Sequence, residues 1–316
     1  MRRFRLPLVL LAVVLLAGTL LRPTVASAET DDPLPVPYGF LPAAILNGLP
    51  NANAAGTNDW SCKPSAAHPR PVVLVHGLIG NRATNWPTYG PLLKNNGYCV
   101  FALTYGVEYD ITPINLVGGV DDMRTSAGEL KTFVDRVLAA TGSRKVDLVG
   151  HSEGTLMPNW YLKYLGGAAK VKNYVGLASV YNGTIAPKEV TALLSTLLPP
   201  DGILPTGCRS CLQFATGSKF LQKLHQGGML QSGVTYTSIV TKYDELVLPY
   251  TNGTMPGVKN IVLQDVCPLD FSEHFQIVSS RNAAQLVLNA LDPAHARKVS
   301  CSVVLPFVGE LLPGLS

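Results

Sequence analysis

The chain has no concentrated cluster of lysine and arginine outside its leading segment. The full sequence carries 25 Lys and Arg against 21 Asp and Glu, and the excess consists of Arg2, Arg3, Arg5 and Arg22 near the start. Without these arginines the two signs balance, and the formal charge is zero. A protein that binds nucleic acid needs a concentrated basic face to neutralise phosphates. The sequence therefore argues against a nucleic-acid partner and favours an uncharged or apolar ligand.

Beyond its start, the chain also lacks a long uninterrupted apolar run. Only residues 6–21 approach the ~20 apolar residues that cross a bilayer. This run follows a basic segment and precedes Ala26-Ser27-Ala28, an arrangement typical of a secretory signal peptide with its cleavage site. A membrane anchor is the competing interpretation, but Pro23 and a cleavage signal stand where a basic stop-transfer flank would be expected. We therefore expect a signal peptide over residues 1–28, cleavage near Ala28, and a secreted protein without a transmembrane anchor.

The sequence lacks a cysteine and histidine pattern with convincing metal-ligand spacing. Cys208 and Cys211 could suggest a zinc knuckle or a redox motif, but no second pair follows, and the segment reads as a Pro/Gly-rich loop rather than a helix start. An even number of cysteines in an exported chain indicates disulfides. We expect no metal, no cofactor, a local disulfide between Cys208 and Cys211, and three disulfides in all. Fifteen pairings are possible among Cys62, Cys99, Cys208, Cys211, Cys267 and Cys301.

Short apolar runs alternate with helical patterns along most of the chain. Runs that are apolar on both faces, as in a sheet covered on both sides, occupy residues 72–76, 98–104, 146–149, 174–179, 235–241 and 260–263. Between them, residues 121–140 carry apolar side chains at three- and four-residue spacing, bounded by Gly119 and Gly142. This alternation predicts an α/β fold with a mostly parallel, doubly wound sheet and right-handed crossovers.

One stretch, residues 186–233, interrupts this alternation between two expected strands. It contains an apolar helical pattern followed by Pro199-Pro200 and Gly227-Gly228. The pattern fits a small cap that gives an apolar substrate its binding wall, and equally a helix packed on the main core, because periodicity does not say what the apolar stripe faces. We expect a single α/β domain over residues 29–316 with a cap insertion at about 186–233.

The most informative motif is Gly150-His151-Ser152-Glu153-Gly154, which follows the apolar run at residues 146–149. A G-x-S-x-G sequence between a strand and a helix is a nucleophile elbow, in which the serine backbone is strained and the flanking glycines leave room for a tight turn. We therefore expect Ser152 to stand at the carboxyl end of the sheet as a catalytic nucleophile. The alternative is a serine in an ordinary turn.

Such a serine needs an imidazole to accept its proton and a carboxylate to orient the imidazole, in the chain order Ser, acid, His. His274 follows the expected strand at residues 260–263 and is our predicted base, whereas His295 lies in a polar segment typical of a solvated surface. The acid should follow the preceding strand, which leads directly to Asp244. Glu245 is the second choice, and Asp265 and Asp270, on the histidine's own loop, fit turn-stabilising roles.

The negative charge that forms on the substrate oxygen also needs backbone N–H donors. In this fold the donors are the residue after the serine and a residue after an early strand. These positions are Glu153 and Leu78, and Gly77 and Gly80 let the second loop approach the site. His76 is better explained by its backbone turn, and His151 by packing beside the elbow.

Together these residues resemble the secreted bacterial lipases of the α/β-hydrolase superfamily, the class 2 lipase family, and more distantly fungal lipase B. The resemblance covers roughly residues 62–301 and rests on VVLVHG at 72–77, GHSEG at 150–154, the Asp244-Glu245 pair, and Cys267 shortly before His274. It implies pairing of Cys62 with Cys99 and of Cys267 with Cys301, which leaves Cys208 with Cys211. Glu153 stands where lipase B has glutamine and Leu78 where it has a hydroxyl residue, so only the backbone donors carry over.

The site predicts a metal-independent serine hydrolase of carboxylic esters, and the resemblance together with the apolar cap implies lipid esters, with triacylglycerols as the expected substrate. A cutin or polyester esterase and an acyltransferase are alternative enzymes. A secreted lipid-binding protein with an inactive triad is the alternative from another class. The expected partner is a lipid or other ester substrate at a lipid–water interface, and the expected state is a monomer.

Overall fold

Six parallel strands form one sheet in the order β2-β1-β3-β4-β5-β6. The computed structural model describes residues 32–46, 52–107, 117–185 and 208–310. The strands are β1 (Val72–Val75), β2 (Val100–Leu103), β3 (Val146–His151), β4 (Val171–Leu177), β5 (Thr235–Val240) and β6 (Lys259–Val262). The six expected strands are thus confirmed, with ends that shift by a few residues.

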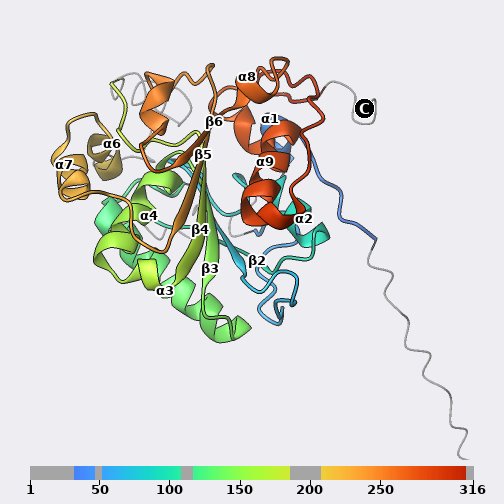
Figure 1. The fold of residues 1–316 in the computed structure, drawn as a ribbon, viewed down its shortest axis with the longest axis horizontal. Coiled ribbons are helices and arrows are strands. Elements are labelled where there is room, and N and C mark those ends of the chain that lie inside the picture. The colour runs from blue at the N-terminus through green and yellow to red at the C-terminus, as the bar shows by residue number, and fades with distance from the viewer. Residues whose placement is uncertain (1–31, 47–51, 108–116, 186–207, 311–316) are drawn as a thin grey trace, which may run out of the picture. The chain divides into compact units, whose positions relative to one another are not determined.

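Helices cover both faces of this sheet (Figure 1). The α-helices are α1 (Phe40–Leu46), α2 (Tyr89–Asn95), α3 (Met123–Thr141), α4 (Glu153–Tyr164), α6 (Arg209–Gln213), α7 (Lys219–His225), α8 (Leu263–Val266) and α9 (Arg281–Leu291). Short 3-10 helices are η1 (Gly167–Ala169), η2 (Tyr250–Gly253), η3 (Gln276–Ser279) and η4 (Pro293–His295). From Pro33 onward the described residues belong to one compact unit, and no helix among them is long and apolar enough to cross a bilayer.

Alternate residues of each strand point into two separate cores. In β1, Val73 and Val75 join the core under α3 and α4, whereas Val72 and Leu74 join the core under α2 and α9. Because side chains alternate across a strand, apolar residues at every position are buried only when both faces are covered. This arrangement confirms the predicted α/β fold with a parallel, doubly wound sheet.

Local sequence signals fix the ends of the longest helix, α3. The Asp122 side chain accepts a hydrogen bond from the Arg124 N–H at its start, and Gly142 ends it in a left-handed conformation with φ of 74°. A side chain that accepts an early N–H and a glycine at positive φ are the usual signals for these two ends. The helical pattern expected over residues 121–140 is confirmed within two residues at each end.

The expectation for the Cys208 segment is wrong in one respect. Cys208 is the N-terminal cap of α6, not part of a loop, and its Sγ accepts from the Cys211 N–H. The short helix is held by tertiary contacts, since the Arg209 N–H donates to the Val120 carbonyl at 2.9 Å and the Ser210 hydroxyl to the Gly119 carbonyl at 2.6 Å. Of the cap insertion expected at 186–233, residues 186–207 lie outside the described residues.

Three disulfides join Cys62 to Cys99, Cys208 to Cys211, and Cys267 to Cys301. This is the pairing that the resemblance implied. The first ties the segment before β1 to the start of β2, and the third ties the segment after α8 to a segment beyond α9. The second bridges a sequence separation of only 3 residues.

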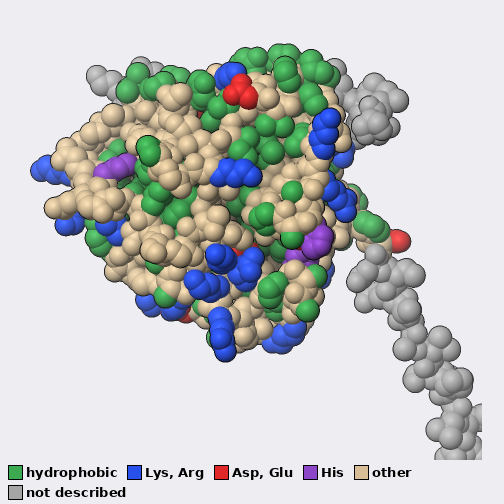
Figure 2. Space-filling model, viewed as in Figure 1, with side chains coloured by type: hydrophobic (Ala, Val, Ile, Leu, Met, Phe, Trp, Pro, Cys, Tyr) green, Lys and Arg blue, Asp and Glu red, His purple; other side chains and the backbone are tan. Residues whose placement is uncertain are grey.

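The tertiary structure also assembles a basic cleft from separate parts of the chain. Arg70, Arg144, Lys145 and Lys172 line it, and no acidic residue is among its described lining. These residues lie at the amino ends of the strands, and Figure 2 shows many Lys and Arg side chains on this lower part of the molecule. The absence of a basic run in the sequence therefore does not exclude a basic surface.

We predict that removing the disulfide between Cys62 and Cys99 by a double serine substitution lowers the free energy of unfolding by about 3–4 kcal/mol. The disulfide spans a separation of 37 residues and restricts the unfolded chain accordingly. The corresponding change at Cys208 and Cys211 should have the smallest effect. Denaturant unfolding of both variants checks this, and an equal or larger loss for the Cys208 and Cys211 pair would contradict the loop-length argument.

Candidate active site

Ser152 lies in a strained turn between β3 and α4, with φ of 53° and ψ of −120°. A Cβ atom added to Gly150 would lie 2.0 Å from the Gly154 carbonyl oxygen, and one added to Gly154 would lie 2.1 Å from the Val75 carbonyl oxygen. Both distances are far below any tolerated contact. The requirement for glycine at these two positions, inferred from the motif, is therefore confirmed by the packing.

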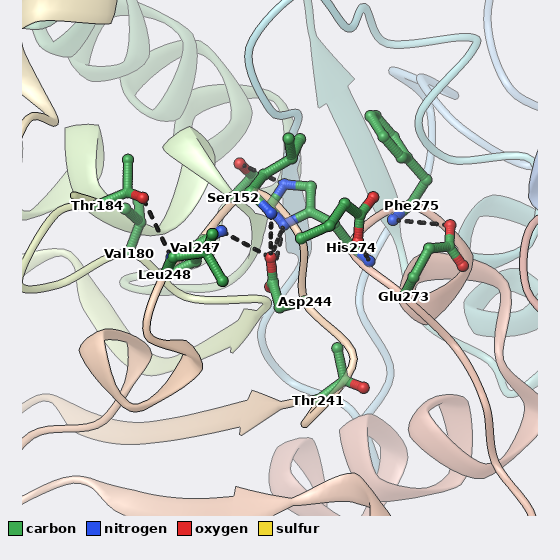
Figure 3. Close-up of polar contacts among 12 residues, drawn as sticks. Ser152, Val180, Thr184, Thr241, Asp244, Val247, Leu248, Glu273, His274 and Phe275 are labelled. Atoms are coloured by element: carbon green, nitrogen blue, oxygen red, sulfur yellow. Dashed lines mark hydrogen bonds and ion pairs between the residues drawn. The ribbon is translucent and has the colours of Figure 1, made fainter. Parts of the chain in front are cut away.

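Ser152, His274 and Asp244 point toward one another from three loops at the carboxyl ends of the strands (Figure 3). His274 Nε2 lies 2.9 Å from Ser152 Oγ. His274 Nδ1 lies 2.9 Å and 3.0 Å from the two carboxylate oxygens of Asp244. Since a carboxylate only accepts, Nδ1 carries the proton and Nε2 presents its lone pair to the serine hydroxyl. The structure thus brings the three predicted residues into one hydrogen-bonded chain.

The two neighbouring carboxylates, Asp244 and Glu245, hold different parts of His274. Asp244 Oδ1 also accepts from the backbone N–H groups of Leu246 and Val247 at 3.0 Å and 2.7 Å, which fixes the carboxylate that faces the ring. Glu245 Oε2 accepts from the backbone N–H of His274 at 3.1 Å and does not bond the ring. The geometry therefore favours Asp244 over Glu245 as the group that orients the imidazole.

The charges around His274 raise the pKa of its imidazole. Burial alone would lower this pKa, but the negative charge and hydrogen bond of Asp244, with smaller effects of Glu245 and Glu273, outweigh it. A raised pKa means that the imidazolium is stabilised when the ring accepts a proton. This is the property required of a base that takes the serine proton and later returns it.

A polar network that the sequence did not reveal supports the loop that carries His274. Gln264, at the start of this loop in α8, donates to the Thr241 hydroxyl at 2.8 Å and to the Asp270 carbonyl at 2.9 Å. Thr241 in turn donates to the Ser272 carbonyl at 2.6 Å. The loop between β6 and His274 thus contains the helical turn α8, and its bonds to Thr241, directly after β5, place His274 beside Asp244.

Asp270 stabilises the loop that carries His274, in keeping with the turn-stabilising role expected from the sequence. Its carboxylate accepts from the Ser272 N–H at 2.9 Å and from the Ser280 hydroxyl and Asn282 amide at 2.6 Å and 2.9 Å. Ser280 also caps α9, which begins at Arg281. Asp265, by contrast, pairs with Lys242 at the surface.

His76 and His151, which were expected to have structural roles, are both buried. His76 Nδ1 donates to the Gly77 carbonyl at 2.7 Å, and its Nε2 accepts from the Tyr105 N–H at 3.2 Å. Burial lowers the pKa of His76 to about 4, so the ring is neutral at physiological pH. His151 is also kept neutral by burial, and its Nε2 donates to the His274 carbonyl at 2.9 Å. His295 is exposed and pairs with Asp292.

The loop after β1 approaches the serine through a tight turn. Gly80 donates its N–H to the Gly77 carbonyl at 3.0 Å, and Ile79 adopts a positive φ of 56°. The Gly77 N–H donates to Asn85 Oδ1 at 3.2 Å, and the latter also lies 3.1 Å from His151 Nδ1. Leu78 therefore belongs to a turn that packs against the elbow, since a Cβ atom added to Gly77 would lie 3.1 Å from Ser152 Cβ.

A mostly apolar pocket opens above Ser152. Its described lining consists of Leu78, Ile79, His151, Ser152, Glu153, Val180, Thr184, Phe214, Leu246, Val247, His274 and Phe275. Most of the apolar members were not identified from the sequence, because they come from loops after four different strands. Among the described residues, no group of three or more His, Cys, Asp or Glu side chains is arranged to hold a metal ion. A pocket of this kind suits an apolar ligand with a single reactive polar group.

Comparison with known proteins connects this site to lipases. The family model for lipase (class 2) matches residues 69–287. A triacylglycerol lipase of Burkholderia plantarii is 31% identical over 174 residues, which are 51% of this chain and 39% of that protein. A triacylglycerol lipase of Pseudarthrobacter phenanthrenivorans is 32% identical over 144 residues, which are 43% of this chain and 35% of that protein. The chain thus spans less than half the length of these curated relatives.

Among solved structures, lipase B of Aspergillus fumigatus is similar in fold. It aligns with a TM-score of 0.57 and 21% identity, covering 83% of this chain and 61% of that chain. A lipase of Bacillus licheniformis in its mature form aligns with a TM-score of 0.56 and 17% identity, covering 79% of this chain and all of that chain. At these sequence identities, the similarity shows a shared fold and nothing more.

We predict that Asp244→Asn lowers kcat by about 10⁴-fold, because the imidazole loses the carboxylate that sets its tautomer. Glu245→Gln should be much milder, since this side chain bonds only the His274 backbone N–H. Steady-state kinetics on a soluble ester compares the two. If Glu245→Gln were the more damaging change, Asp244 would be the wrong carboxylate.

We also predict that kcat/KM rises with pH through a midpoint above 6.5, the ordinary pKa of histidine. Only the neutral ring can accept the serine proton, and the carboxylates around His274 raise the pKa at which it becomes neutral. Glu245→Gln should move this acid limb to lower pH, because it removes one of those charges. An acid limb that is unchanged by this substitution would show that Glu245 does not act on the ring.

Proposed function

This chain belongs to the class 2 lipase family, and on that premise we propose that it hydrolyses carboxylic esters of lipids through an acyl-enzyme on Ser152. Triacylglycerols are the proposed main substrates, in keeping with the activity named for both bacterial relatives. The observation that supports the proposal best is the hydrogen-bonded chain from Ser152 through His274 to Asp244. A lipid-binding protein without activity would have no need of this geometry.

In the first half of the reaction, Ser152 Oγ attacks the ester carbonyl carbon while His274 Nε2 takes the hydroxyl proton. The carbonyl oxygen becomes negatively charged, and the backbone N–H groups of Leu78 and Glu153 are the proposed donors to it. Both residues line the pocket above the serine. When the intermediate collapses, the bond to the alcohol oxygen breaks, and His274 gives its proton to the departing alcohol.

In the second half, a water molecule attacks the acyl carbon and gives a proton to His274. The bond between the acyl group and Ser152 Oγ then breaks, the fatty acid leaves, and the proton returns to the serine oxygen. Throughout, Asp244 remains a carboxylate and stabilises the imidazolium. The two backbone N–H groups that bond Asp244 Oδ1 hold it in place for this task.

The pocket supports a substrate with an apolar acyl group. The serine is surrounded by the apolar side chains of Val180, Phe214, Val247 and Phe275. The Thr184 hydroxyl, also in the lining, accepts a hydrogen bond from the Leu248 N–H at 3.1 Å (Figure 3). Burial of methylene groups against such side chains stabilises binding by about 0.8 kcal/mol each. Long-chain esters should therefore gain affinity as their chains fill this pocket.

We further propose that the protein is exported as a monomer after cleavage near Ala28. The pattern of residues 1–28 and the three disulfides support export, because disulfides persist in oxidising compartments. The proposed mature chain is a single domain over residues 29–316 with a cap insertion at about 186–233. It acts at a lipid–water interface without a metal or other cofactor.

We predict that Ser152→Ala lowers kcat by on the order of 10⁶-fold, because the variant has no nucleophile to form the acyl-enzyme. A fluorophosphonate probe should label the wild-type protein at Ser152 and leave the variant unlabelled. Mass spectrometry of the labelled protein, together with hydrolysis of a triacylglycerol emulsion, tests both claims. Labelling without hydrolysis of any lipid ester would retain the nucleophile and reject the substrate class.

A further inference from the structure

Glu153, the residue after the serine, has a carboxyl group that the proposed mechanism does not use. Its side chain is buried at the start of α4, and neither carboxyl oxygen accepts a hydrogen bond from any described residue. A Cβ atom added to Gly119 would lie 3.5 Å from Glu153 Oε1 and 3.2 Å from Leu78 Cα. The carboxyl group therefore lies next to the segment that packs against the Leu78 turn.

Two hydroxyl groups face this carboxyl, but each already donates its proton to a backbone carbonyl group. Tyr105 and Ser210 are close enough to influence the pKa of Glu153. The Tyr105 hydroxyl donates to the His76 carbonyl at 2.8 Å, and the Ser210 hydroxyl donates to the Gly119 carbonyl at 2.6 Å. Each hydroxyl has one proton, so what it presents to Glu153 is a lone pair. An ionised carboxylate would face acceptors, whereas a protonated carboxyl could donate to one of them.

We propose that Glu153 is a positioning residue that acts as a neutral carboxylic acid. Its O–H donates to the Tyr105 or Ser210 hydroxyl, and this bond connects the first residue of α4 to the segments that carry Gly119 and the start of α6. The backbone N–H of Glu153 is thereby held where the Leu78 turn supplies the second oxyanion donor. This role rests on the proposed function, because the position of that N–H matters only if an oxyanion forms beside it.

A protonated Glu153 makes the free energy of unfolding decrease as the pH rises. Burial raises the pKa of Glu153 well above its ordinary value of 4.5, against the smaller lowering effects of Ser210 and Tyr105. A group whose pKa is raised on folding favours the folded state fully at pH below 4.5, and this contribution is lost as the pH rises through the folded pKa. Glu153→Gln keeps the shape and an N–H donor but cannot ionise, so it should not show this loss.

Denaturant unfolding of wild type and Glu153→Gln across a pH series tests whether the Glu153 carboxyl is protonated in the folded protein. We expect the ratio of the two unfolding equilibrium constants to change by about tenfold per pH unit above pH 4.5, in favour of the variant. Infrared spectroscopy should detect the C=O stretch of a protonated carboxylic acid in the wild type at neutral pH, and the variant should lack it. A ratio that is constant with pH, or equal spectra, would overturn the neutral form.

Glu273→Gln is the matched control, because Glu273 is also a buried glutamate beside a catalytic position but has donors. Its carboxylate accepts from the backbone N–H groups of Phe275, Gln276 and Phe307 at 3.2 Å, 2.9 Å and 3.2 Å. Glu273→Gln should therefore destabilise the protein at neutral pH and should not gain stability as the pH rises. A gain like that of Glu153→Gln would show that the pH effect is not specific to Glu153.

Steady-state kinetics tests the positioning role of Glu153 independently of its protonation state. The ratio of kcat/KM at alkaline pH to kcat/KM at neutral pH should be higher for Glu153→Gln than for the wild type, because at alkaline pH the wild-type carboxyl ionises and loses its bond. Identical alkaline limbs would overturn the positioning role. Absence of ester hydrolysis in the wild type would reject the proposed function instead, and the unfolding and infrared results would still decide whether Glu153 is neutral.

Discussion

Contact between backbones around Ser152 is the constraint on which the site depends. A Cβ atom at Gly150 or Gly154 would lie about 2 Å from a carbonyl oxygen, so β1, β3 and α4 can meet only because both positions lack side chains. This contact forces Ser152 to a positive φ, a conformation that costs a non-glycine residue of order 1–3 kcal/mol. The same turn places Ser152 at the carboxyl end of β3, directly before the first residue of α4. The backbone strain, the proposed nucleophile and the proposed oxyanion donor thus all depend on this one contact.

The three buried histidines of this region differ in proton affinity because only one of them has a carboxylate that bonds its ring. Burial lowers the pKa of His76 and His151, which lack a carboxylate that bonds the ring. His274 is equally buried, but Asp244 reverses the effect and raises its pKa. Because the charged form of a buried ring survives only with a partner, the position of one carboxylate selects which imidazole can accept a proton. The neutral His151 can then donate to the His274 carbonyl without competing for the serine.

The loops that carry the candidate triad are held by bonds between segments that are distant in the chain. His151 on β3 bonds the loop of His274, and Thr241, directly after β5, bonds the same loop. The disulfide between Cys267 and Cys301 restrains the start of that loop. Side chains that act in catalysis must be held in a fixed geometry. In this protein the segments that hold them follow the ends of strands, and the sheet fixes where those strands end. The loop of Leu78 packs against the same elbow, since a Cβ atom added to Gly77 would lie 3.1 Å from Ser152 Cβ.

The sequence by itself determined the elements and much of the candidate triad, because these depend on residues that are neighbours in the chain. Apolar runs located all six strands, the glycine spacing located Ser152, and strand ends led to Asp244 and His274. Only the tertiary structure decided the helical start at Cys208, the network of Gln264, and the basic cleft, which combines residues from separate segments. The buried state of Glu153 is of the same kind, since sequence gives the identity of a charged residue but not its solvation. Burial and long-range hydrogen bonds depend on how helices and strands pack together. This packing cannot be inferred from the pattern of neighbouring residues in the sequence.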